Sequence, residues 1–379
     1  MCTPVRLDSW VVCAHKQSGT EGGGLVKSFR YAKVILLLVA LAVVASACGG
    51  DDGGGSDGGE EGIVRFAFAP DPAWDWIVDQ GILEAMEAES GFRILQTVTW
   101  DEIGVFAGGH ADVVSIGSYE TPVIESEQGI DTVTIGKFNL AKDVVIVTTD
   151  KDWETFADLP EGCVIGVESF VGGSTVWQAL ADDLEGREIA EGSSDLPMAT
   201  ADYQVMPDLV ISGDFCAGII DPTQAIPEFA TGAIKTLYDG KSGSQMYADV
   251  YQPGHAGMTS NNFVTLESWY EDHPGEVAFF LEVWQRALDE WAAHREEIID
   301  TYPEHFAAED ESQVQFMKDY FVDTFDWFVT SPYLDEAWIQ GEEEITEILR
   351  RAELISDDLD MPFHVCIDPA SGEETCKLP

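Results

Sequence analysis

Short apolar runs alternate with helical segments over the first two thirds of the chain. The runs that predict strands lie at residues 63–69, 92–98, 111–116, 132–135, 143–148, 163–167 and 216–220. Helices are expected over residues 74–89, ahead of the third run, and after Gly173. Strands that alternate with helices in this way predict an α/β fold.

From residue 265 onward the pattern becomes helical. Beyond Gly275, apolar side chains recur at steps of three and four residues, namely Val277, Phe280, Leu281, Trp284, Leu288 and Trp291. This spacing places them on one face of a helix. We interpret these aromatic residues as core packing rather than as ligand contacts.

A different apolar segment lies near the N-terminus. Residues 34–47 contain no charge, follow Lys27, Arg30 and Lys33, and are followed at once by Cys48. This run is shorter than the roughly 20 apolar residues that a permanent membrane span needs. The pattern predicts a signal peptide over residues 1–47. Because a basic n-region is normally short, we expect translation to start at Leu25 or Val26, leaving residues 1–24 untranslated.

The residues around Cys48 point to a lipid anchor. The sequence Ala45-Ser46-Ala47-Cys48 resembles the bacterial lipobox, in which the cysteine is acylated and becomes the new N-terminus. The alternative is an ordinary signal peptide that happens to be followed by cysteine. Apart from Cys48 and Ser56, residues 48–62 are glycine and acidic residues with little to bury, so we expect an acidic, flexible tether there. The sequence therefore predicts an extracytoplasmic lipoprotein held on the outer face of the cell membrane.

The amino-acid composition and net charge limit which classes of binding partner we expect. The 379 residues are 45% hydrophobic, which is enough for two domains with cores, and 70 acidic residues outnumber 19 Lys and Arg, for a net charge of −51. Such a surface repels a phosphate backbone, so we do not expect this protein to bind nucleic acid. The acidity is typical of a heavily hydrated surface.

Four segments carry a resemblance to a known family. They read AGGHADV at residues 107–113, DLPEGCVIGV at 158–167, SGDFCAGIIDP at 212–222 and HPGEV at 273–277. In this order, with the lipobox and tether, they resemble substrate-binding lipoproteins of ABC importers. The family is the nitrate, sulfonate and taurine type, which also includes binders of pyrimidine precursors.

The resemblance implies a type II periplasmic-binding fold with two α/β lobes, two crossover strands and a helical C-terminal region. Lobe I is expected at residues 62–140 plus 256–379 and lobe II at 141–255, with crossovers near 138–140 and 251–253. It also implies a small-molecule ligand between the lobes and an ABC permease with its ATPase as partners. We expect a monomer without a cofactor.

Strand ends supply the first candidates for ligand contacts, because open α/β sheets bind ligands outside the C-terminal ends of their strands. Asp71, Trp74 and Trp76 follow the first strand and could form a cage for a flat or cationic ligand. In the alternative, one tryptophan packs under the loop and Asp71 or Asp75 caps the helix. We favour capping for Asp75 and ligand contact for Trp74.

Two glycine-containing turns follow. Ser118 and Tyr119 end the third strand and are expected to face the cleft. A later strand, turn and helix contain Ser169, Gly173, Ser174 and Thr175, whose N–H groups at a helix N-terminus suit an anion or carboxylate. Simple capping by Ser and Thr is the alternative.

The last candidates lie near the crossovers. Asp221 ends a strand and either accepts a hydrogen bond from an amine or amide of the ligand or caps a helix, and Asn139 and Asn261 are possible amide contacts. Among basic residues only Lys137 and Lys142 flank the expected hinge. We therefore favour a neutral, zwitterionic or cationic nitrogenous ligand and leave a sulfonate open.

Motifs for catalysis are absent from the sequence. The seven histidines form no HExxH or His-x-His pattern, no Cys-x-x-Cys occurs, and there is no nucleophile elbow, P-loop or dinucleotide fingerprint. We expect no metal, no catalytic residues and no enzymatic activity. The alternatives are a ligand-sensing or scaffold lipoprotein of the same fold and a pyrimidine-precursor enzyme on it.

Four cysteines remain after Cys48, in a compartment where thiols oxidise. Cys163 and Cys216 each precede an acidic strand end by five residues, so they start level if their strands are neighbours. Cys366 and Cys376 would then close a small loop in the tail. The sequence predicts these two disulfides.

Overall fold

The computed structural model describes residues 62–170, 172–351, 355–356 and 362–378, without the side chains of residues 126–128. The chain divides into two units, Met1–Asp57 and Gly58–Pro379, and the description below concerns the second. The predicted signal peptide, Cys48 and the tether up to residue 61 lie outside the described residues.

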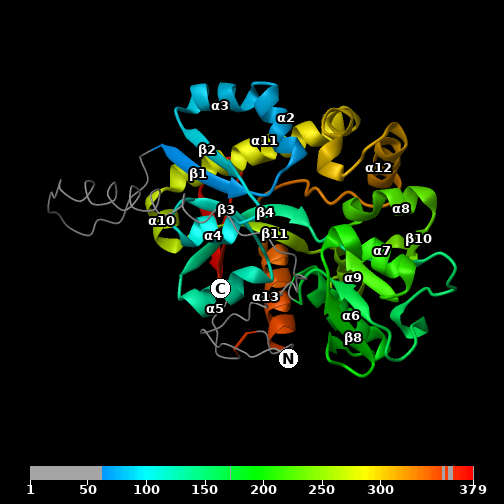
Figure 1. Ribbon diagram of the computed structural model, residues 1–379. Coiled ribbons are helices and arrows are strands. Elements are labelled where there is room, and N and C mark those ends of the chain that lie inside the picture. The colour runs from blue at the N-terminus through cyan, green and yellow to red at the C-terminus, as the bar shows by residue number, and fades with distance from the viewer. Residues whose placement is uncertain (1–61, 171, 352–354, 357–361, 379) are drawn as a thin grey trace, which may run out of the picture. The chain divides into compact units, whose positions relative to one another are not determined.

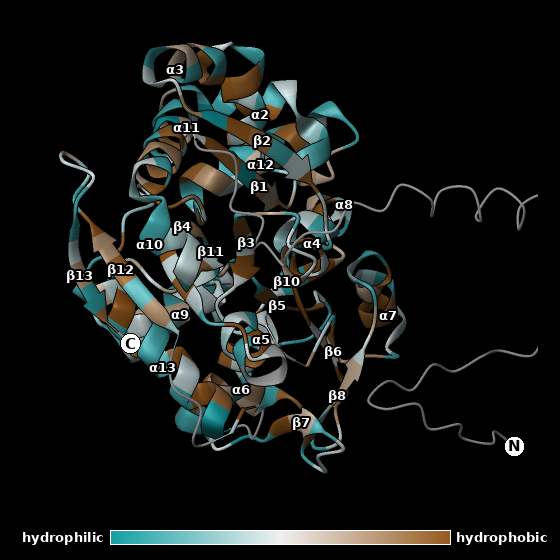
Figure 2. Ribbon diagram, turned by 90° about the vertical axis from the view of Figure 1, so that its left-hand side faces the viewer, coloured by the Kyte–Doolittle hydropathy of each residue, from teal (hydrophilic) through white to brown (hydrophobic). Residues whose placement is uncertain are grey.

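The first sheet has seven strands among the described residues, in the order β13-β12-β4-β11-β3-β1-β2. Figure 1 labels β1, β2, β3, β4 and β11 of this sheet, and Figure 2 labels β12 and β13 as well. Their bounds are β1 Ile63–Phe68, β2 Arg93–Val98, β3 Val113–Gly117, β4 Thr132–Leu140, β11 Thr259–Leu266, β12 Phe363–Ile367 and β13 Glu374–Leu378. Strands β1, β2 and β3 are parallel, whereas β11 runs antiparallel between β3 and β4. Because these three strands are parallel, the loops that follow them lie at the same end of the sheet.

The second sheet has six strands in the order β10-β5-β9-β6-β8-β7. Their bounds are β5 Val144–Thr148, β6 Ile165–Val167, β7 Ile189–Glu191, β8 Leu196–Thr200, β9 Ala217–Ile220 and β10 Ile234–Thr236. Strand β6 is parallel to β8 and β9, and β5 is antiparallel to β9. The C-terminal ends of β6 and β9 therefore lie beside each other.

Helices connect these strands. The α-helices are α2 Pro72–Asp79, α3 Ile82–Ser90, α4 Glu102–Ala107, α5 Glu120–Gln128, α6 Gly173–Glu185, α7 Met206–Ser212, α8 Ile226–Thr231, α9 Gly243–Val250, α10 Glu267–Asp272, α11 Pro274–Thr301, α12 Glu311–Asp323 and α13 Glu336–Arg351. Short 3₁₀ turns are η1 Phe156–Asp158, η2 Tyr203–Val205, η3 Pro222–Ala225, η4 Tyr238–Gly240 and η5 Pro303–Phe306. None of the described helices is long and apolar enough to cross a bilayer.

The chain passes between the sheets twice. It leaves the first sheet at the end of β4, enters the second at β5, and returns through the segment between α9 and β11. The boundaries predicted after residues 140 and 255 fall in these two connections. The division into lobes I and II remains a prediction. One helix of the predicted lobe I contacts the predicted lobe II: α13 packs against α6, with Ile345 and Leu349 in the same buried cluster as Trp177.

The long helix α11 confirms the predicted apolar stripe. All six side chains of the stripe are buried, and α11 packs against α2 and β1. Figure 2 shows brown hydrophobic and teal hydrophilic residues alternating along this helix, as an amphipathic helix requires. Trp284, at the centre of the stripe, is fully buried.

Three details differ from the sequence-based expectations. The predicted helix over residues 74–89 is two helices, because Gly81 between them has a φ of 69° that interrupts helical geometry. The strand expected at residues 132–135 continues to Leu140. The C-terminal region is not wholly helical, since β12 and β13 form a hairpin that pairs with β4 at the edge of the first sheet.

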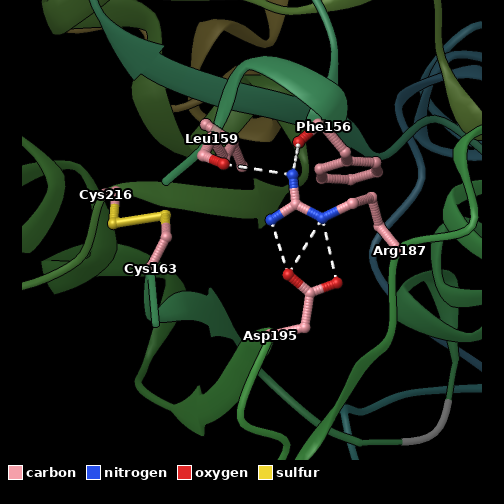
Figure 3. Close-up of a disulfide and its surroundings, with 6 residues drawn as sticks. All are labelled: Phe156, Leu159, Cys163, Arg187, Asp195 and Cys216. Atoms are coloured by element: carbon pink, nitrogen blue, oxygen red, sulfur yellow. Dashed lines mark hydrogen bonds and ion pairs between the residues drawn. A yellow bond between two sulfur atoms is a disulfide. The ribbon is translucent and has the colours of Figure 1, made fainter. Parts of the chain in front are cut away.

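Both predicted cysteine pairs lie at disulfide-bonding distance. Cys163 lies two residues before β6 and Cys216 one residue before β9. The register that pairs Ile165 with Ala217 sets the two cysteines one residue out of level, and the pair bridges this offset. Cys366 and Cys376 face each other across the terminal hairpin. Beside the first pair, the Arg187 guanidinium makes two parallel hydrogen bonds to Asp195 and also donates to the carbonyls of Phe156 and Leu159 (Figure 3). These contacts tie the loops at this end of the second sheet together.

Candidate functional site

A cavity of about 380 Å³ lies where loops of both sheets meet. Its wall includes residues that follow strands of both sheets: residues 69–72 after β1, Gly117, Tyr119 and Glu120 at and after the end of β3, residues 167–169 at the end of β6, and Asp221 after β9. Such strand ends are where open α/β sheets bind ligands. The volume lies in the range of small-molecule sites.

Asp71 lines the cavity and also caps α2. Its Oδ1 accepts hydrogen bonds from the backbone N–H groups of Ala73 at 2.9 Å and Trp74 at 3.0 Å. Burial raises the pKa of Asp71 to about 6, although these hydrogen bonds and His305 oppose the shift. The predicted capping role thus falls on Asp71, while Asp75 bonds to His305 Nε2 at 2.8 Å.

The two tryptophans expected in the cleft do not line the cavity. Trp74 is fully buried and stacks on Trp284, with 5.6 Å between ring centroids. Trp76 donates its indole N–H to Glu290 at 3.2 Å. Because Asp71 caps the helix, positions 74 and 76 turn toward α11 and the core instead of the cavity.

A different tryptophan stands at the cavity wall. Trp100 follows β2, lines the cavity and is 81% exposed. Extending the strand-end argument to β2 would have found Trp100 and Glu102, which the sequence analysis missed. A large exposed ring at a cavity mouth can cover a bound ligand when the loops close.

At the end of β3 the structure separates the two candidates. Tyr119 lines the cavity. Ser118 does not: its Oγ lies in a buried network with Thr259, Asn262 and Glu342. This hydroxyl points to the other side of the turn and supports the packing of α13 rather than a ligand.

The turn before α6 contributes Ser169, Gly173 and Ser174 to the cavity wall, and the Ser174 hydroxyl donates to the Ser169 carbonyl at 2.8 Å. Thr175 is fully buried and is not part of the wall. Asp143 occupies the space beside Gly173: a Cβ on that glycine would lie 1.9 Å from Asp143 Oδ2. Only glycine lets this carboxylate sit against the start of α6.

Asp143 is the most consequential residue that the sequence analysis missed. It precedes β5, is buried, lines the cavity, and accepts a hydrogen bond from the Tyr203 hydroxyl at 3.2 Å. Burial, and next the charge of Asp221, raise the pKa of Asp143 to about 6. The sequence analysis searched for ligand contacts at the C-terminal ends of strands. Asp143 lies at the N-terminal end of β5, so that search did not find it.

Asp221 lies at the cavity wall as predicted and is fully engaged. Its Oδ1 accepts from the backbone N–H and the hydroxyl of Thr223 at 2.9 and 2.8 Å, which caps η3. Its Oδ2 pairs with the Lys142 ammonium at 2.7 Å, and that ammonium lies 5.0 Å from the centre of the Trp327 ring. The capping alternative for Asp221 is therefore confirmed, and its contact with a ligand remains a prediction.

The two asparagines lie together on adjacent strands. Asn139 and Asn261 both line the cavity, and the Asn261 N–H donates to Asn139 Oδ1 at 3.2 Å. Lys137 is buried elsewhere, with its ammonium 4.3 Å from the centre of the Trp338 ring, and burial lowers its pKa to about 8.

Two further titratable groups face the cavity. Burial, and next the charge of Glu120, raise the pKa of Glu102 to about 7. Burial lowers the pKa of His305, but the hydrogen bond and charge of Asp75 outweigh it and leave the pKa raised. In the part of the chain that the structure describes, no group of three or more His, Cys, Asp or Glu residues is placed to hold a metal ion.

Comparison with known proteins gives a likeness in fold. No family model matches the sequence, and no curated protein matches it. The periplasmic aliphatic sulphonate-binding protein SsuA from Escherichia coli is similar in structure, with 13% identity, a TM-score of 0.61, and coverage of 79% of this chain and 91% of that one.

Two more solved structures extend this likeness. The periplasmic nitrate-binding protein NrtA from Synechocystis has 12% identity and a TM-score of 0.54, covering 79% of this chain and 83% of that one. A Candida albicans protein with the generic periplasmic binding protein fold has 15% identity and a TM-score of 0.54, covering 78% and 92%. The predicted periplasmic-binding fold is confirmed.

Proposed function

We propose that this chain is the extracytoplasmic solute-binding protein of an ABC importer, which captures a small molecule without altering it. The observation that carries the proposal is the cavity itself. It is built from the C-terminal ends of strands in two separate sheets, and the chain passes between those sheets only through short connections. Small relative movements of the two sheets would enclose a ligand there.

The proposal includes a membrane anchor. Acylated Cys48 and the acidic tether hold the protein, as a monomer, at the outer face of the membrane, next to a permease and its ATPase. A Cys48→Ser variant should appear in the soluble fraction, whereas the wild-type protein should sediment with membranes. A variant that remains uncleaved in the membrane fraction would contradict the lipobox reading.

A binding role suits the cavity chemistry better than catalysis. The cavity wall includes one imidazole, that of His305, and its Nε2 already bonds to Asp75. Cys163 and Cys216 pair with each other instead of facing the cavity. The groups at the wall are carboxylates, amides, hydroxyls and aromatic rings, which orient a ligand by hydrogen bonds and stacking.

The test is a thermal-shift screen of the purified protein followed by mass spectrometry of solutes that copurify. Its panel contains putrescine, spermidine, choline, taurine, methanesulfonate and nitrate. Under the proposal at least one solute raises the melting temperature by mass action and is recovered unchanged. Conversion of the stabilising solute into a product would refute the proposal, and so would a panel and a copurified fraction that contain no binder.

A further inference from the structure

The cavity wall has an excess of negative charge. Six carboxylates line it, from Asp71, Glu102, Glu120, Asp143, Glu168 and Asp221. Among the described lining residues the cationic side chains are Lys142 and His305, and no arginine contributes. Each of these two already contacts a carboxylate, Asp221 and Asp75 respectively. An anion entering the cavity would therefore meet repulsion that no free cation offsets.

The start of α6, which could receive an anion, has a carboxylate beside it. The start of α6 presents N–H groups, and in many proteins such a helix end receives a phosphate, sulfonate or carboxylate of a ligand. Here the carboxylate of Asp143 lies against Gly173, where a methyl group would be 1.9 Å from Oδ2. A buried carboxylate thus lies beside this helix end, and a sulfonate or nitrate bound there would meet its negative charge.

A corner of the same wall already holds an ammonium group. Lys142 Nζ lies 2.7 Å from Asp221 Oδ2 and 5.0 Å from the centre of the Trp327 ring. A carboxylate together with an aromatic face is the combination that binds alkylammonium groups, through ion pairing and cation–π attraction. This corner shows which chemistry the wall stabilises.

The rest of the wall repeats that combination without a cation in place. The Tyr203 ring lies beside Asp143, bonded to it through its hydroxyl. Trp100 exposes 81% of its surface and stands near Glu102 at the cavity wall. These aromatic and acidic side chains come from different elements, so a ligand placed among them would contact rings and carboxylates together.

We infer that the cavity takes an organic cation, one that carries an amine, amidinium or quaternary ammonium group, and this inference rests on the proposed function. Its ammonium or amidinium group pairs with Asp143 and Glu168, while aromatic rings of the wall cover its apolar part. The inferred ligand differs in charge from sulfonate and nitrate, which the similar solved proteins SsuA and NrtA are described as binding.

The panel described above tests the inference directly. We expect putrescine, spermidine or choline to raise the melting temperature, with an effect that weakens as salt is added, and taurine, methanesulfonate and nitrate to leave it unchanged. Stabilisation by the sulfonates or nitrate, and not by the cations, would overturn the inference and leave solute binding intact. Absence of any binder would remove the proposed function together with the inference.

Variants locate the effect at the cavity. For the stabilising cation, Asp143→Asn and Glu168→Gln should each raise the dissociation constant about tenfold or more in isothermal titration calorimetry. Asp208→Asn, an exposed acidic position on α7 outside the cavity wall, is the matched control and should leave it unchanged. Because Glu168 is exposed, its variant keeps the test valid where Asp143→Asn fails to fold. Equal affinities in wild type and Glu168→Gln, with weakening in Asp208→Asn, would contradict the inference.

Discussion

Replacing Trp74 by alanine should lower the free energy of unfolding by about 3–5 kcal/mol, the usual cost of deleting a large buried aromatic side chain. Trp74 is fully buried, stacks on Trp284, and meets Phe66 and Phe68 edge to face. The cavity left behind would lie between α2 and α11, where rigid aromatic rings cannot close it. Urea unfolding followed by far-ultraviolet circular dichroism measures the loss.

Trp100→Ala is the matched control. The same side chain is removed at a position that is 81% exposed, so stability should stay within about 0.5 kcal/mol of wild type. Binding of the stabilising cation should weaken instead, because Trp100 lines the cavity. If Trp74→Ala unfolds at the wild-type urea concentration and binds ligand more weakly, Trp74 belongs to the site after all and its assignment to the core is wrong.

These two tryptophans show what the sequence could and could not decide. The strand-end rule correctly located the loop after β1, but not which side chains of that loop face outward. That depended on where α2 begins, and the cap formed by Asp71 fixes the helix start at Pro72. One capping hydrogen-bond pair thus decides the orientation of Trp74 and Trp76.

The fold itself was largely predictable, because its strands are short apolar runs with helices between them. Strand spacing predicted the pairing of Cys163 with Cys216, and the structure brings the two sulfurs together although the two positions are one residue out of register. The C-terminal hairpin was missed because β13, with the sequence ETCKL, is a polar edge strand that pairs only with β12. An edge strand of this kind has little apolar patterning to detect.

The candidate ligand contacts also fall into two groups, those that line the cavity and those that do not. The candidates that line the cavity include Tyr119, Asn139, Asp221 and Asn261. Tyr119 and Asp221 directly follow β3 and β9, and Asn139 and Asn261 lie on β4 and β11. Ser118 and Thr175 are next to lining residues in the sequence, but their own side chains point away from the cavity. Adjacent residues in a turn face opposite sides, and the sequence does not say which.

Asp143 lay beyond the reach of sequence patterns for a different reason. Its position beside α6 arises from the pairing of β5 with β9 and from the missing side chain of Gly173, which are separated along the chain. Its carboxylate places a negative charge beside the turn before α6, where the sequence analysis expected an anion site. The sequence already favoured a neutral, zwitterionic or cationic ligand, and this tertiary contact adds a reason to expect repulsion of an anion.

The pH dependence of binding should separate a cationic ligand from an anionic one. In the unliganded protein Asp143 has a pKa of about 6, raised first by burial and next by Asp221. The groups around it are Lys142, Asp221, Glu168 and the Tyr203 hydroxyl. Folded protein therefore holds a proton on Asp143 at pH 5 and loses it by pH 8, and a cation binds the ionised form more tightly.

The sign of the effect on stability follows from the same pKa. Because the folded pKa lies above the ordinary aspartate value of 3.8, the contribution of Asp143 to stability is fully present below that value and is lost as the pH rises through about 6. Without ligand, wild type should lose more stability than Asp143→Asn between pH 5 and pH 8. A bound cation should restore part of this loss, since it offsets the buried charge.

For choline, whose charge does not change with pH, the dissociation constant at pH 8 should be about fivefold below that at pH 5. A cation that lowers the pKa of this one carboxyl from about 6 by about one unit accounts for that factor. Calorimetry at pH 6 in buffers of different ionisation enthalpy should show protons released on binding, and Asp143→Asn should flatten the profile. Affinity that rises toward pH 5, with protons taken up, would mean that the bound species carries negative charge.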